Sequence, residues 1–169
     1  MSNIIRKFKV RQLLRAHTCI VRELRYQELT DIRSCLLVAR ANSASIADVH
    51  YMESKLPGLD LSILYWGKPA DPIVESDRLV YLQNSNLSLN GRIKHPYFGK
   101  LMSRNYDLAV DLTFKDNDII RFLLSQINAG FIVGAENSCK MADMLLPAEQ
   151  DGSAFIDNLL EILKNLKTY

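Results

Sequence analysis

An unbroken apolar run, Cys35-Leu36-Leu37-Val38-Ala39, is the feature that most constrains the fold of this chain. A run without polar alternation is typical of a strand covered on both faces, as in a parallel sheet. The following segment, 42–45, is rich in residues that cap helices, and a helix is expected over about 46–55, where Pro57-Gly58 ends it. A second strand over 59–66 completes a strand, helix, strand unit.

The same alternation continues to the end of the chain. The pattern predicts further strands at 79–82, 106–112 and 131–134, and helices at 97–104, 118–128 and 153–166. In the segment 84–96, the Asn90-Gly91 pair suits a hairpin turn, and a long surface loop is equally consistent with the sequence. We therefore predict an α/β fold: a single Rossmann-like domain over 1–169, with a mainly parallel sheet of about five strands and helices on both faces.

The first part of the chain is basic. Residues 1–28 carry seven Lys and Arg side chains and two Glu side chains, whereas the net charge of the whole chain is only +2. Apolar residues recur at three- and four-residue steps, which predicts one amphipathic helix over 3–28 packed on the domain. Arg11, Arg15, Arg22 and Arg25 fall roughly on one face of this helix. Such a face suits RNA or an anionic membrane surface, or it is the solvated side of an ordinary helix.

Composition narrows the class of protein. Of the 169 residues, 48% are apolar and 24% are charged, which is ordinary for a globular domain. The three cysteines are scattered without CxxC or metal-ligand spacing, so we expect a reducing, cytoplasmic setting and no metal site. The start lacks the apolar core of a signal peptide, and we expect no transmembrane segment.

Ligands of open α/β sheets bind beyond the carboxyl ends of the strands. Four predicted loops lie there: 40–48, 66–72, 111–118 and 134–140. They bring together the candidate ligand-binding residues Asn42, Ser43, Ser45, Lys68, Asp111, Lys115, Asp116, Glu136, Asn137 and Lys140, with Asp48 as a candidate catalytic base. An alternative is that Ser43, Ser45 and Asp48 only cap the start of a helix. The loop 40–48 contains no glycine, so a dinucleotide cofactor is not expected.

Trp66, the single tryptophan, ends the second predicted strand beside Tyr65 and Gly67. An aromatic ring at that position could stack on a ligand, or it could close the edge of the core.

Part of the sequence resembles a known family. The stretches that carry the resemblance are Leu36-Leu37-Val38-Ala39-Arg40, Ser45-Ile46-Ala47-Asp48-Val49, 56–64, Tyr106-Asp107-Leu108-Ala109-Val110-Asp111-Leu112 and Gly130-Phe131-Ile132-Val133-Gly134. Together, residues 34–134 are similar to the amino-terminal, acceptor-binding domain of the heptosyltransferases of lipopolysaccharide synthesis. The chain as a whole also resembles a family of small uncharacterised proteins from Bacteroidetes.

The resemblance implies a role for Asp48. In the transferases, the Asp of a Gly-Asp pair at the head of the first helix is the catalytic base on the acceptor sugar. Asp48 matches that Asp, and Ala47 stands in place of the Gly. A second Rossmann-like domain holds the sugar-nucleotide donor in that family, and 169 residues leave no room for one.

Three hypotheses about function follow. The first is a non-enzymatic or degenerate Rossmann-like module that binds a small polar ligand, a protein or a second copy of itself. The second is a small, glycosyltransferase-like enzyme acting on a sugar or nucleotide with Asp48 as base. The third is a protein that binds RNA or an anionic membrane through residues 1–28.

Overall fold

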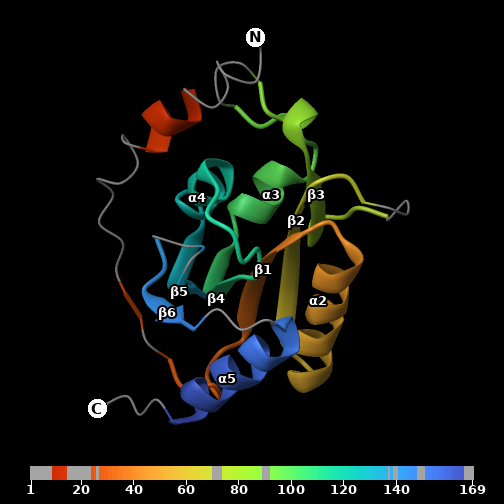
Figure 1. Cartoon of the computed structure of the whole chain (residues 1–169). Helices are drawn as coiled ribbons and strands as arrows, with labels where there is room; N and C mark the ends of the chain where they lie inside the picture. The colour runs from red at the N-terminus through yellow and green to blue at the C-terminus, as the bar shows by residue number, and fades with distance from the viewer. Residues whose placement is uncertain are drawn as a thin grey trace.

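The computed structural model describes residues 9–14, 24–25, 27–69, 74–88, 92–136, 138, 141–147 and 151–165. These residues form three layers, with a central sheet between two layers of helices (Figure 1). The strands are β1 (Ser34–Arg40), β2 (Asp60–Trp66), β3 (Leu79–Leu82), β4 (Asn105–Asp111), β5 (Asn128–Ala135) and β6 (Met144–Leu146). The helices are α2 (Ser43–Lys55), α3 (Phe98–Met102), α4 (Asp118–Leu124) and α5 (Gly152–Asn165), with a 3-10 turn at Asn84–Asn86.

All pairs of neighbouring strands in this sheet are parallel, in the order β3-β2-β1-β4-β5-β6. The predicted Rossmann-like α/β class is therefore confirmed, and the order is that of the dinucleotide-binding folds. The sheet has six strands where about five were expected. The three residues of β6 were missed because so short a segment carries no periodic signal.

Apolar side chains cover both faces of the central strand β1. Each residue from Cys35 to Ala39 is completely buried, at the centre of the sheet. Leu37 packs in a cluster with Met52 of α2 and Phe155 of α5. Leu36 lies on the opposite face, in a cluster with α3 and α4. Because β1 alternates its side chains between two apolar layers, each of its five central positions, Cys35 to Ala39, must be apolar.

The structure of the amino-terminal segment differs from the helix predicted over 3–28. Residues 9–14 are helical, but the described residues 24–25 and 27–28 are not, so a single helix over 3–28 is wrong. The reason is a tertiary backbone bond: the Arg25 amide donates to the Gly130 carbonyl of β5 at 3.0 Å. Arg11, by contrast, pairs with Asp118 at the start of α4. Arg15 and Arg22 lie outside the described residues, and Arg11 and Arg25 do not share one helical face.

The segment between β3 and α3 contains one antiparallel bridge, between Leu87 and Ile93. The Ser88 amide donates to the Arg92 carbonyl at 2.9 Å beside it. The Asn90-Gly91 pair expected to form a hairpin turn lies outside the described residues. Among the residues that the structure describes, no helix is long and apolar enough to cross a membrane.

One carboxylate fixes the start of the central strand. Asp107 of β4 accepts hydrogen bonds at Oδ2 from the Arg33 amide and the Ser34 amide, both at 2.9 Å, and from the Ser34 hydroxyl at 3.0 Å. The Ser34 hydroxyl oxygen in turn accepts from the Asp107 amide at 3.0 Å. These bonds join β1 to β4 below the first residue of their backbone pairing, Cys35 with Leu108.

Replacing Asp107 by Ala should lower the free energy of unfolding by about 2–4 kcal/mol, because three donors lose a charged acceptor. Urea denaturation followed by circular dichroism measures this loss. Asp77→Ala, at an exposed position, is the matched control and should change stability by less than about 0.5 kcal/mol. Equal stability of the two variants would contradict a structural role for Asp107.

Candidate functional site

The strand order places a topological switch point between β1 and β4. After β1 the chain enters α2 on one face of the sheet, and after β4 it enters α4 on the other face. The two connections therefore diverge and leave the carboxyl edge of the sheet open between them. Ligands of open α/β sheets bind in the crevice at such a point.

A pocket of about 380 Å³ lies at this carboxyl edge. Its walls come from the ends of two strands, from the start of α4 and from the helical segment 9–14. The lining residues are Arg11, Trp66, Asn84, Asp116, Asn117, Asp118 and Ile119. The volume is within the range of roughly 300–1,000 Å³ that is usual for small-molecule sites.

The charges around this pocket are nearly balanced. The Arg11 Nε lies 2.7 Å from the Asp118 carboxylate and ties the segment 9–14 to α4. Arg121, one turn further along α4, bridges Asp116 at 2.9 Å and Asp118 at 2.6 Å. Two carboxylates thus face two guanidinium groups, an arrangement that does not favour a strongly anionic ligand such as a diphosphate.

Trp66 forms one wall of the pocket. It is the last residue of β2 and is partly buried against the apolar cluster beneath α3 and α4. The next residue, Gly67, has a φ of +124°, a backbone conformation that favours glycine, so the chain turns away sharply after the indole. The ring is held by the core on one side and lines the pocket with the rest of its surface.

The loop between β4 and α4 is held in a strained conformation. Phe114 has a φ of +51°, and among the described residues it is the non-glycine residue with a positive φ. Its ring packs edge-on against Phe155 of α5, with centroids 5.3 Å apart. Before it, the amide and hydroxyl of Thr113 donate to Asp111 at 2.9 and 2.7 Å. After it, Asn117 caps α4 by accepting from the Ile119 amide at 2.8 Å.

Strain of this kind persists only where the surroundings over-determine the backbone, and it is concentrated at functional sites. Here the rigid loop presents Asp116, Asn117 and Asp118 to the pocket. The loop is therefore preorganised before any ligand arrives.

The structure brings together only some of the residues expected at this edge. Asp116 lines this pocket, and so does Arg11, which was predicted to lie on a partner-binding face of the amino-terminal segment instead. Asn42 is the N-cap of α2 and accepts from the Ser45 amide at 2.9 Å, so a side chain predicted to bind a ligand caps the helix, rather than those of Ser43, Ser45 or Asp48. Ser45 and Asp111 are buried, while Ser43, Lys68, Lys115 and Glu136 are exposed. Asn137 and Lys140 lie outside the described residues.

Six of the seven lining residues were not among the predicted ligand-binding set: Arg11, Trp66, Asn84, Asn117, Asp118 and Ile119. Asn84 lies two residues after the end of β3, and the general rule for carboxyl-edge loops would have included it had the third strand been used. Trp66 was considered: its ring packs against the core, as one of its two expected roles requires, and it also lines the pocket, whereas stacking on a ligand stays a prediction. Its indole was a feature of the sequence that could have indicated this pocket.

Asp48 lies beside the amino terminus of α5 rather than among the residues that line this pocket. Its carboxylate packs directly against Gly152, where an added Cβ would collide with it. Burial raises the pKa of Asp48, and the nearby carboxylate of Asp151 raises it further. Asp151 itself accepts from the Ser153 amide and hydroxyl, and these bonds lower its pKa.

The fold and this edge define a Rossmann-like α/β domain with a ligand-sized pocket outside the carboxyl ends of its strands. Within the described ranges, no group of three or more His, Cys, Asp or Glu side chains gathers in a way that could hold a metal ion. The chain belongs to the DUF6913 family, a family of unknown function, whose model matches residues 4–166. No curated protein and no solved structure matches it at a significant level.

The contact between α2 and α5 requires glycine at position 152. Gly152→Ala should lower the free energy of unfolding by about 1–3 kcal/mol, because the new methyl group displaces the Asp48 carboxylate. Thermal denaturation of the single variant and of the double variant Asp48→Ala/Gly152→Ala measures the effect. In the Asp48→Ala background, Gly152→Ala should lower the stability much less than it does in the wild-type protein. Equal losses in the two backgrounds would contradict this packing.

The raised pKa of Asp48 has a definite consequence for stability. Its protonated form favours the folded state, so this contribution is present at low pH and is lost as the pH rises through the folded-state pKa. Asp48→Asn should therefore raise the Tm at pH 7 and leave it nearly unchanged at about pH 3, below the ordinary pKa of aspartate. A lower Tm of the variant at pH 7 would show instead that the positive end of the α5 dipole stabilises the charge.

Proposed function

We propose that this protein is a Rossmann-like binding module that takes a small polar ligand with a ring face, such as a nucleoside or a monosaccharide, in the carboxyl-edge pocket. The observation that carries the proposal is the position of Trp66 in a pocket of about 380 Å³ beside Asn84 and Asn117. Aromatic rings bind nucleobases and the apolar faces of sugars by stacking, and amide side chains supply both donors and acceptors.

The pocket also disfavours the ligand of a typical dinucleotide-binding domain. Backbone approach to a pyrophosphate depends on glycines in the loop after β1, and here Asn42 and its neighbours form an ordinary capped start of α2. The paired charges of Arg11, Asp116 and Asp118 add no net positive potential. Recognition of an uncharged ring is the chemistry that remains.

A binding role suits this edge better than catalysis. The resemblance to an acceptor-binding domain supports a sugar-like ligand and does not require turnover. Asp48, the candidate base, packs at the start of α5, where its carboxylate is in contact with Gly152. An enzyme that used Asp48 as its base would need that carboxylate at the ligand.

Because Trp66 is the single tryptophan, intrinsic fluorescence reports on this pocket directly. Titration with nucleosides and monosaccharides should shift or quench the emission of the wild-type protein. Trp66→Ala should weaken the binding of the same ligand by about 1–3 kcal/mol, as measured by isothermal titration calorimetry, because the stacking surface is lost.

Tyr51→Ala, which removes a partly buried ring on α2, is the matched control and should bind the ligand with wild-type affinity. The proposal fails if no nucleoside or monosaccharide changes the emission, or if Trp66→Ala binds as tightly as the control.

A further inference from the structure

The helical segment 9–14 supplies one wall of the carboxyl-edge pocket through Arg11. In Figure 1 this segment is the red helix near α4. The other lining residues, from Trp66 to Ile119, belong to the sheet, to its loops and to the start of α4. The pocket is therefore complete only while the segment is in place.

Two apolar side chains dock the segment on the domain. Val10 is completely buried and Leu14 is 8% exposed, and both pack with Leu87 and Phe122. These four residues form a small cluster of their own, separate from the two clusters that cover the faces of the sheet. Loss of this cluster would leave both main cores intact.

The ion pair between Arg11 and Asp118 is a weak addition to this docking. The Arg11 side chain is 67% exposed, and ion pairs at such positions contribute little and are screened by salt. No backbone hydrogen bond between described residues joins 9–14 to another element. Segments held by few buried contacts are those that open locally while the rest of a protein stays folded.

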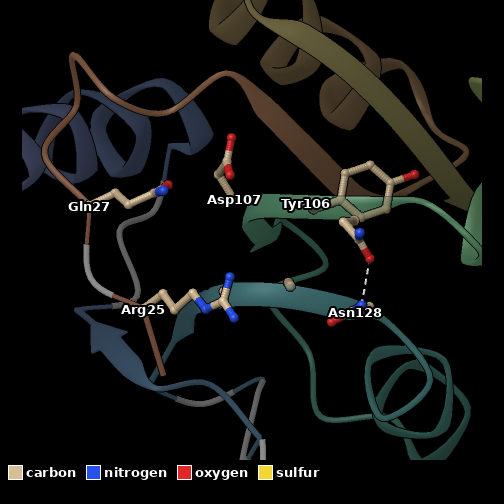
Figure 2. A pocket seen from close by; sticks show the side chains of 8 residues that line it. Arg25, Gln27, Tyr106, Asp107 and Asn128 are labelled. Carbon is tan, nitrogen blue, oxygen red and sulfur yellow. Dashed lines mark hydrogen bonds between the residues drawn. The ribbon is translucent and has the colours of Figure 1, made fainter. Parts of the chain in front are cut away.

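The chain is fixed again at the opposite edge of the sheet. The Arg25 amide donates to the Gly130 carbonyl of β5 at 3.0 Å. The Arg25 side chain lines a pocket at that edge together with Asn105 and Asp107 (Figure 2). This backbone bond keeps the chain on the sheet when 9–14 is released, so that redocking is an intramolecular step with a high effective concentration.

We infer that the segment 9–14 is a gate of the carboxyl-edge pocket, closed when Val10 and Leu14 pack against α4 and open when they are released. A ligand that touches the wall formed by Arg11 binds the closed state more tightly and shifts the equilibrium toward it. By the same linkage, a change that opens the gate lowers the affinity for that ligand. The inference rests on the proposed function for its ligand, whereas opening of the gate is measured without one.

Val10→Glu tests the gate in the ligand-free full chain. A carboxylate at a completely buried position is unfavourable, so this variant should hold the gate open. Acrylamide quenching of Trp66 should then increase and its emission maximum should move to longer wavelength, because the indole gains access to solvent. Gln12→Glu places the same charge at an exposed position of the same segment, and this matched control should behave as the wild type does.

Leu14→Ala is a milder variant that introduces no charge. It should raise the opening constant of the segment by roughly tenfold or more, because most of a buried leucine side chain is removed. Hydrogen exchange of the amides of 9–14, followed by mass spectrometry, measures this constant. Gln12→Ala is its control and should change the constant by less than about threefold.

Equal quenching of Trp66 in Val10→Glu and Gln12→Glu would overturn the inference. Loss of the cooperative unfolding transition in Val10→Glu would overturn it as well, because the segment would then be part of the core. Failure of the proposed function is a separate result: the emission of Trp66 would respond to no nucleoside or monosaccharide, while the quenching experiment would still decide whether the gate exists.

For a ligand that does bind, Val10→Glu should lower the affinity by roughly tenfold, although Val10 does not line the pocket. Wild-type affinity in this variant would show that the segment does not control the site.

Discussion

The burial of β1 on both faces is the constraint on which the rest of the structure depends. This strand lies at the centre of the sheet, paired with β2 on one side and β4 on the other, and five consecutive residues have no exposed surface. Two apolar layers are needed to cover it, and they are supplied by α2 with α5 and by α3 with α4. Because α2, which follows β1, and α4, which follows β4, lie on opposite faces, the connections after these two strands separate, and the carboxyl edge becomes a place where a ligand can enter.

The two edges of the sheet carry different kinds of side chain. The carboxyl edge combines an indole, a strained loop around Phe114 and an ion-pair network between the segment 9–14 and α4. The amino edge is rich in amides, and Asp107 there holds the start of β1 through its donors at Arg33 and Ser34. Aromatic and amide groups at the carboxyl edge suit neutral ligands with a ring face, whereas the carboxylate at the amino edge is engaged by amide and hydroxyl donors at the start of β1.

The sequence predicted the elements that repeat a pattern and missed those that do not. The apolar run from Cys35 to Ala39 and the helix-ending pair Pro57-Gly58 were sufficient to predict the first strand, helix, strand unit. The strand β6 has three residues and no periodicity, so its pairing with Val133 to Ala135 depends on the neighbouring strand. The helix expected over 3–28 failed near Arg25 because a backbone bond to Gly130 outweighs the local helical pattern there.

The candidate site shows the same division. The rule that ligands bind at carboxyl ends pointed to an edge where a pocket lies, and it included Asp116 without Asn84 or Asn117. Asp48 was singled out by a motif, yet its surroundings are set by Gly152, which is distant in sequence. No spacing in the chain indicates that Arg25 and Asn105 line one pocket.

By itself, the sequence determined the class of the fold, since buried strands separated by helices are typical of a parallel sheet that the helices cover. It also determined the local caps, such as Asn42 and Asn117, because capping bonds form within a few residues. The tertiary structure alone decided which side chains meet at each edge. Pockets are made by residues far apart in the chain, and their proximity follows from strand order and register, which no local pattern encodes.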